Sequence, residues 1–171
     1  MDNKCKIINC IIALLSILVI VMVVILAFNS NEQEKNILTA IANEGDNTQI
    51  GITTIKFSEN EILIGNAISH IENTDTININ ENGIYQISYQ LYGMRETIGT
   101  FNFSAIILVN DTAVNETFNE SPILRDNVVN RMTLTSTVFL KLNAGDTVKL
   151  KALSIEDISY PTSRIDIEKI Y

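Results

Sequence analysis

The segment Gly83–Tyr92 constrains the fold more than any other stretch of this chain. Its apolar positions alternate with polar ones: Tyr85, Ile87, Tyr89 and Leu91 against Gln86, Ser88 and Gln90. Because side chains alternate between the two faces of a strand, this pattern predicts a β-strand with one buried, aromatic-rich face. A sheet that buries only one face needs a second layer to cover it. The segment therefore predicts a two-layered β structure.

Runs of the same kind follow one another from Gln49 to the end of the chain. The candidate strands are Ile50–Phe57, Ile62–Ile68, Thr76–Ile79, Gly83–Tyr92, Phe101–Val109, Ala113–Phe118, Arg131–Leu140, Thr147–Leu153 and Ser163–Ile170. Clusters rich in Asn, Asp and Gly separate them and are typical of turns. Short, regularly spaced strands with no convincing helix between them indicate an all-β, antiparallel sandwich or barrel.

Composition and charge exclude several classes of protein. The net charge of −8 argues against a nucleic-acid partner, which requires basic patches. Both cysteines lie in the first ten residues, so no disulfide or thiolate–metal framework holds the β region together. The sequence contains no fingerprint of a catalytic, metal or cofactor site, and we predict no enzyme activity and no cofactor. His70 is expected in a surface turn, and Asp146 is expected to accept hydrogen bonds from backbone amides of its own turn.

The stretch from Ile7 to Phe28 is apolar and uncharged, interrupted only by Asn9 and Ser16. As a helix with a rise of about 1.5 Å per residue it spans roughly 33 Å, enough for a hydrocarbon core of about 30 Å. The alternative is a cleaved signal peptide, but the run is longer than such an apolar region and no small-x-small cleavage site follows it. We therefore predict a single transmembrane helix in contact with the lipid bilayer.

The charges beside the apolar run set its orientation and the domain plan. Lys4 and Lys6 precede it, whereas Glu32 and Glu34 follow it, so the amino terminus is predicted in the cytoplasm and the carboxy-terminal domain outside the cell. The plan is a cytoplasmic tail over 1–6, a transmembrane helix over 7–28, a juxtamembrane stalk over 29–48 and a β domain over 49–171. Apolar residues within the stalk stand at helical spacing, which allows a short helix, although a flexible spacer is the default interpretation.

Several phrases of the β domain line up in order with one family. The most specific is Leu140–Leu150, with the sequence LKLNAGDTVKL, and the others are Asn82–Tyr89, Ile106–Val114 and Ser163–Ile170. Over about the last 120 residues the chain resembles the carboxy-terminal domain of BclA-like exosporium glycoproteins. That domain belongs to the jelly-roll superfamily of tumour necrosis factor (TNF) and the complement globular heads. The chain departs from BclA because it lacks a collagen-like region and carries the apolar run instead.

The resemblance implies a TNF-like jelly roll that assembles as a homotrimer through its inner sheet. This sheet would include the strands around Tyr85–Tyr89, Thr133–Thr137 and Ile165–Ile167. Carried over to this sequence, five polar residues are expected on or near the subunit interface: Gln86, Ser88, Gln90, Thr135 and Asp166. Buried polar groups require hydrogen-bond partners, which symmetry-related copies could supply. The alternative is that these side chains simply face solvent.

Two functions remain open from the sequence. The first is a non-catalytic, membrane-anchored trimer on a bacterial surface, with a structural role in the cell envelope or the outer layer of a spore. The second is an adhesin or ligand-like module whose trimeric head recognises a host protein or glycan, because linked sites multiply weak affinities.

Overall fold

The structure, a computed structural model, describes residues 14–24, 35–43, 48–95, 99–126 and 130–171. The chain divides into two compact units, Met1–Glu34 and Lys35–Tyr171. In the first unit, residues 14–24 are α-helical, apolar except for Ser16, and exposed. Within the described part of the chain, no helix combines the length and the apolar character that crossing a bilayer requires. The predicted helix over 7–28 otherwise lies outside the described residues.

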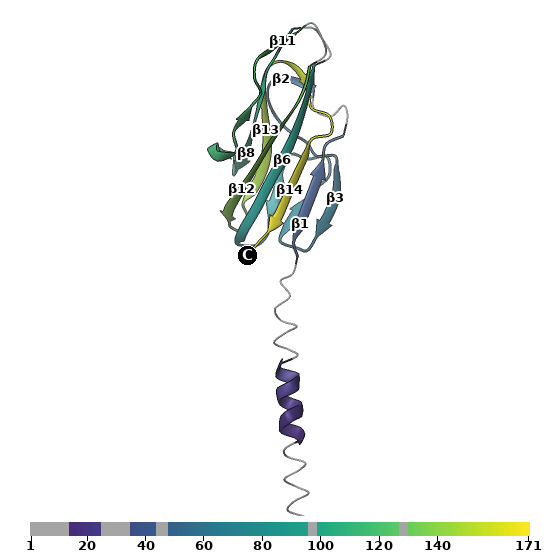
Figure 1. Ribbon diagram of the computed structural model, residues 1–171, viewed down its shortest axis with the longest axis vertical. Coiled ribbons are helices and arrows are strands. Elements are labelled where there is room, and N and C mark those ends of the chain that lie inside the picture. The colour runs from purple at the N-terminus through teal and green to yellow at the C-terminus, as the bar shows by residue number, and fades with distance from the viewer. Residues whose placement is uncertain (1–13, 25–34, 44–47, 96–98, 127–129) are drawn as a thin grey trace, which may run out of the picture. The chain divides into compact units, whose positions relative to one another are not determined.

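The second unit is built from strands and one short 3₁₀ helix (Figure 1). In chain order they are β1 (Ile37–Ile41), β2 (Thr48–Thr54), β3 (Glu59–Ile64), β4 (Ile68–His70), β5 (Ile77–Ile79), β6 (Gly83–Arg95), β7 (Gly99–Phe101), β8 (Phe103–Val109), β9 (Thr112–Ala113), η1 (Asn115–Thr117), β10 (Asn119–Glu120), β11 (Leu124–Asp126), β12 (Asn130–Leu142), β13 (Thr147–Ser159) and β14 (Arg164–Lys169). Every pairing between these strands is antiparallel.

The strands form two layers with the core between them. In one layer the order is β12–β6–β14–β1–β3, and these strands run side by side in Figure 1. The other layer contains β10–β8–β13, with β2 and β5 on the far edge of β13. Hydrogen bonding passes between β13 and β6 at one residue pair, Ser159 and Met94. The all-β, two-sheet prediction is therefore confirmed.

The alternation in β6 produces the predicted buried face. Tyr85, Ile87, Tyr89 and Leu91 are at most 3% exposed, while the polar residues between them point outward. The Tyr89 hydroxyl donates to the Thr117 carbonyl at 2.8 Å, so its polar end is satisfied inside the core. Burial raises the pKa of Tyr89 to about 12. The buried face of β6 thus packs against the opposite layer, and the hydroxyl of Tyr89 keeps a hydrogen-bond partner there.

Gly93 allows the two layers to approach closely. A Cβ atom at this position would lie 2.6 Å from the ring of Phe103, which is fully buried and comes from β8 in the other layer. Phe103 also packs on Tyr160, with ring centroids 5.8 Å apart. The absence of a side chain at Gly93 is therefore what leaves room for the aromatic ring.

Several segments differ from the sequence prediction: Ile62–Ile68, expected as one strand, is divided between β3 and β4, and two others change type. Ile37–Ile41 was expected in the stalk, as a spacer or a helix, but forms β1, because both of its edges pair, with β14 on one side and with β3 on the other. Ala113–Phe118 was expected as a strand, but its middle, Asn115–Thr117, forms η1. There the buried Thr117 hydroxyl donates to the Val114 carbonyl at 2.7 Å and accepts the Ile107 N–H at 2.8 Å, which closes the turn. The compact unit begins at Lys35, ahead of the expected position 49.

Candidate assembly surface

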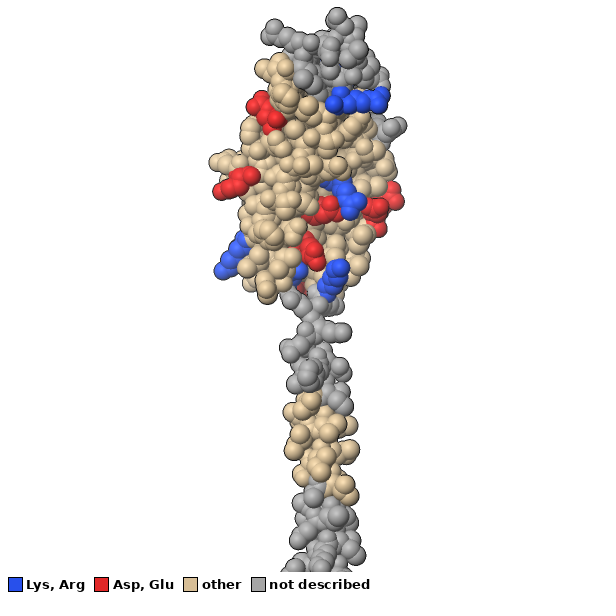
Figure 2. All heavy atoms as spheres, viewed as in Figure 1, with Lys and Arg blue, Asp and Glu red and all other residues tan. Residues whose placement is uncertain are grey.

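The outward side of the layer β12–β6–β14–β1–β3 is the surface on which the predicted interface residues meet, and we call it the open face. Strand register arranges its side chains in three rows that cross all five strands. The rows are Phe139, Gln86, Glu168, Ile37 and Ile64; Thr137, Ser88, Asp166, Thr39 and Ile62; and Thr135, Gln90, Arg164, Ile41 and Glu59. Figure 2 shows this side as mostly uncharged, with basic and acidic side chains adjoining one another near its middle.

A compact polar network occupies the centre of the open face. The Thr39 hydroxyl donates to Asp166 Oδ1 at 2.6 Å, and Arg164 Nε donates to both carboxylate oxygens of Asp166 at 3.0 and 2.9 Å. The hydrogen bond and charge of Asp166 raise the pKa of Arg164. Since both side chains are more than a third exposed, solvent screens this pair and its contribution to stability is small. Its main effect is to fix the position of the Arg164 guanidinium beside Asp166.

A β-bulge brings a second carboxylate to Arg164. The register of β1 against β3 shifts between Thr39 and Ala40, so Glu61 is an extra residue on β3. Bulges redirect a side chain relative to a regular ladder. Here Glu61 Oε2 reaches Arg164 Nη1 at 3.2 Å. Arg164 is consequently shared between two carboxylates.

Beside this network the open face is hollowed. The hollow has a volume of about 150 Å³ and is lined by Ile37, Gln86, Ser88, Asp166, Ile167 and Glu168. A pocket for a drug-sized ligand usually measures about 300 Å³ or more. The hollow on the open face is thus the size for one inserted side chain.

Apolar side chains lie toward the two edges of the open face. Phe139 on β12 is 62% exposed, and Ile62 and Ile64 on β3 are 39% and 49% exposed. Along the outward side of β12, Phe139 follows three threonines and precedes Lys141, so the neighbouring outward side chains of this strand are polar. The open face therefore offers exposed apolar side chains at both of its edges, which a contact between the two edges of neighbouring copies would bring together.

The two edges also differ in charge. On the outward side of β12 the ionisable residues are Arg131 and Lys141, both basic and exposed. At the opposite edge stand Glu59 and Glu61 on β3, and Glu168 stands on the central strand β14. One edge of the open face is therefore electrostatically complementary to the other.

All five predicted interface residues lie on the open face. Gln90 pairs directly with Thr135, and Ser88 pairs with Asp166, with Gln86 one row along on β6. The strands predicted to share the inner sheet, β6, β12 and β14, are neighbours as expected. The participation of the five residues in a subunit interface remains a prediction.

The residues that sequence reasoning missed on this surface are the apolar ones. The sequence could have identified Phe139 as an outward residue. It lies two residues after Thr137 on β12 and so shares the face of the threonines, while the other face of the strand packs into the core. Ile62 and Ile64 were assigned to a strand, but their sequence does not distinguish an outward from an inward position, since Leu63 between them is also apolar.

The two other singled-out residues have structural roles. Asp146 behaves as predicted: its Oδ2 accepts the Asn143 N–H at 2.8 Å, and its Oδ1 accepts the Asn110 side-chain amide at 2.8 Å. These hydrogen bonds lower the pKa of Asp146. The prediction for His70 is wrong, because it is only 6% exposed. Its Nδ1 lies 2.6 Å from Asn60 Oδ1, and its ring packs edge-on against Phe57.

Comparison with solved structures identifies the fold. Crystal structures of murine APRIL at pH 5.0, 8.0 and 8.5 match with TM-scores of 0.57, 0.54 and 0.53 and sequence identities of 13%, 13% and 14%. Each match covers 80% of this chain and 100% of the APRIL chain. The second unit is therefore a TNF-like jelly roll. No protein-family model and no curated protein sequence matches the chain, so the narrower resemblance to BclA-like domains gains no support.

Proposed function

We propose that this protein is a non-catalytic, membrane-anchored surface protein whose jelly-roll head assembles as a homotrimer through the open face. The observation that carries the proposal is the open face itself. It combines exposed Phe139, Ile62 and Ile64 with a hollow the size of one side chain. Burying the exposed part of these side chains against another copy would release water from apolar surface, which favours association.

The arrangement of charge favours a ring over a two-fold dimer. In a two-fold dimer the two copies contact each other through the same surface. In a head-to-tail contact, one surface of the first copy binds a different surface of the second copy. The basic edge at β12, with Arg131 and Lys141, complements the acidic edge near β3, with Glu59 and Glu61. A head-to-tail contact that joins these edges forms a closed ring when its rotation is a whole fraction of a turn, and three copies is the number that the resemblance to TNF-like domains implies.

The membrane part of the proposal rests on the first unit. Residues 14–24 form a helix with no charged residue and with aliphatic side chains on every side. A helix that is apolar all round needs an apolar environment on every side. The apolar stretch from Ile7 to Phe28 is long enough for a span, and the lysines before it favour a cytoplasmic amino terminus. The head would then be displayed on a bacterial cell or spore surface, in a structural role.

Photochemical cross-linking of the full chain in membranes tests this proposal. With p-benzoyl-phenylalanine in place of Phe139, irradiation should give covalent species that end at three copies, with cross-linked peptides from Glu59–Ile64 of a neighbouring copy. The same amino acid in place of Ile155, an exposed residue of the other layer, should give no such ladder. Release of the chain from membranes by alkaline carbonate would contradict the anchor, and absence of any ladder from position 139 would contradict the assembly.

A further inference from the structure

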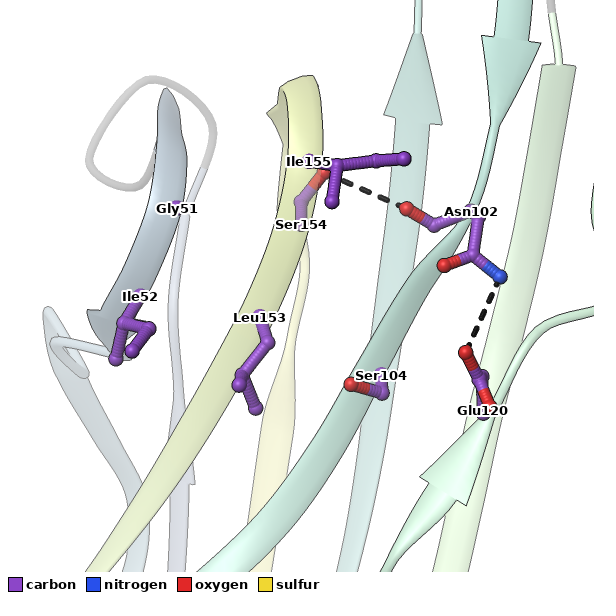
Figure 3. A pocket seen from close by; sticks show the side chains of 8 residues that line it. All are labelled: Gly51, Ile52, Asn102, Ser104, Glu120, Leu153, Ser154 and Ile155. Carbon is purple, nitrogen blue, oxygen red and sulfur yellow. Dashed lines mark hydrogen bonds between the residues drawn. The ribbon is translucent and has the colours of Figure 1, made fainter.

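A second concave surface lies on the other layer of the jelly roll, on its outward side (Figure 3). It is an open groove of about 360 Å³ that crosses β2, β13, β8 and β10. Four residues paired across neighbouring strands follow the length of the groove: Ile52 pairs with Leu153, Leu153 with Ser104, and Ser104 with Glu120. Because Ser104 is small and stands between larger residues, the surface is hollowed at its position.

The β2 end of the groove is aliphatic. Ile52 is 65% exposed and Ile155, from the segment of β13 where the register shifts, is 73% exposed. Leu153 lies between Ile52 and Ser104, and Figure 3 shows Ile52 and Leu153 on the side of the groove away from Glu120, with Ile155 beside Ser154. This end can bury an aliphatic side chain.

The β10 end of the groove is rich in hydrogen-bond acceptors. Asn102 Nδ2 donates to the Ser121 carbonyl at 2.9 Å and approaches Glu120 Oε1 at 3.4 Å, so its Oδ1 is the acceptor that remains (Figure 3). Across the part of the chain that the structure describes, Glu120 forms no ion pair. The Glu120 carboxylate and the Asn102 amide oxygen thus lie at one end of the groove, and the Ser104 hydroxyl lies at its middle.

We propose that this groove binds an extended segment of a partner protein with the pattern aliphatic-x-arginine. Residues two apart in an extended segment point the same way and are separated by about 6.6 Å. Strands in a sheet are about 4.8 Å apart, so Glu120 stands two strand spacings, about 10 Å, from Leu153. A segment lying across the strands with its aliphatic side chain over Leu153 therefore covers most of this distance with its backbone, and the long side chain of the arginine covers the rest. A guanidinium has five N–H donors in a rigid plane and no acceptor, which suits a carboxylate flanked by further acceptors better than a lysine does.

This binding function goes beyond the proposed assembly. The groove belongs to β2, β13, β8 and β10, whereas the open face belongs to the other layer. Occupation of the groove is therefore measurable whatever the oligomeric state of the head.

Methyl NMR of the full chain in detergent micelles, labelled at the isoleucine δ1 methyl groups, tests the proposal. The probe is the peptide acetyl-Leu-Ser-Arg-amide, and its matched control carries citrulline, the uncharged isostere of arginine. The methyl signals of Ile52 and Ile155 should shift saturably with the arginine peptide, while that of Ile84, on the other layer, should not. The citrulline peptide should bind at least about fivefold more weakly, since it cannot form the charged hydrogen bonds to the carboxylate.

A pair of substitutions tests whether the Glu120 carboxylate is the group that binds the arginine of the peptide. Glu120→Gln keeps the size of the side chain and should weaken the arginine peptide about fivefold or more, whereas Glu116→Gln, at an exposed position of η1 outside the groove, should leave it unchanged. The unshifted methyl spectrum of each free variant shows that it is folded. Absence of saturable shifts at Ile52 and Ile155, or equal affinity for the two peptides or for the Glu120→Gln variant, would overturn the proposal.

Discussion

Truncation of Phe139 to alanine should weaken assembly far more than it weakens the fold. The ring is 62% exposed in the isolated chain. A phenylalanine side chain of roughly 200 Å² therefore has about 120 Å² left to bury. At about 25 cal/mol per Å², complete burial against a neighbouring copy contributes about 3 kcal/mol per contact. Most of this is lost in Phe139→Ala, which corresponds to a weakening of about a hundredfold per contact.

Sedimentation equilibrium of the full chain in density-matched detergent measures this effect. The assembled fraction is followed over a dilution series for the wild type, for Phe139→Ala and for Phe139→Leu, which keeps most of the apolar area and should retain most of the assembly. Ile155→Ala is the control, since this residue is 73% exposed but belongs to the other layer. If Phe139→Ala dissociates at the same concentration as the wild type and as Ile155→Ala, the open face is not the interface.

Three further predictions concern the fold and its pH dependence. Replacing Tyr89 with Phe should cost about 1 kcal/mol in the free energy of unfolding at pH 7. Burial raises the pKa of Tyr89 to about 12, so its contribution holds below pH 10 and is lost as the pH rises toward 12. Burial also raises the pKa values of Tyr85 and Tyr160, so the variant should show a smaller alkaline loss than the wild type in chemical denaturation, and an equal loss would refute this. The pKa of Asp146 is lowered, so its contribution holds above pH 3.8 and disappears as the pH falls through the folded-state value. Asp146→Asn should accordingly lower the melting temperature at pH 7 but not in acid, and a gap that persists in acid would refute this. Gly93→Ala should lower the urea midpoint by an amount equivalent to about 1–3 kcal/mol, because the new methyl group meets the Phe103 ring, and an unchanged midpoint would show that the ring can move aside.

Local patterns in the sequence predict the parts of this fold that local chemistry decides. The alternation over Gly83–Tyr92 predicts both the strand β6 and its buried face, and the Asn143–Asp146 phrase predicts the turn in which the Asp146 carboxylate accepts a backbone hydrogen bond. The buried face of β6 follows from the alternation of side chains along a strand, and the turn follows from a hydrogen bond between residues three apart.

Parts of the fold that depend on distant segments were not predictable in the same way. The apolar positions of Ile37–Ile41 fit a helix as well as a strand, and pairing with β14, near the other end of the sequence, decides between them. The same applies to the open face: the rows that join Phe139 to Ile64 cross five strands from separate parts of the chain. Period two places Gln86, Ser88 and Gln90 on one side of a strand, but only the sheet order shows which residues adjoin them.

The groove on the other layer was not predicted for the same reason. Its row joins Ile52, Leu153, Ser104 and Glu120 through three separate pairings, and none of these residues stands out in sequence. If the groove binds its predicted segment, the head combines structural display with recognition. The two functions considered from the sequence would then be carried by opposite layers of one jelly roll.

The number of copies in the assembled particle tests the central claim most directly. Native mass spectrometry of the full chain, released from detergent micelles at micromolar concentration, reports that number without reference to any interface residue. The proposed assembly predicts a particle of three chains. A particle of one chain, or a two-fold dimer, would contradict it.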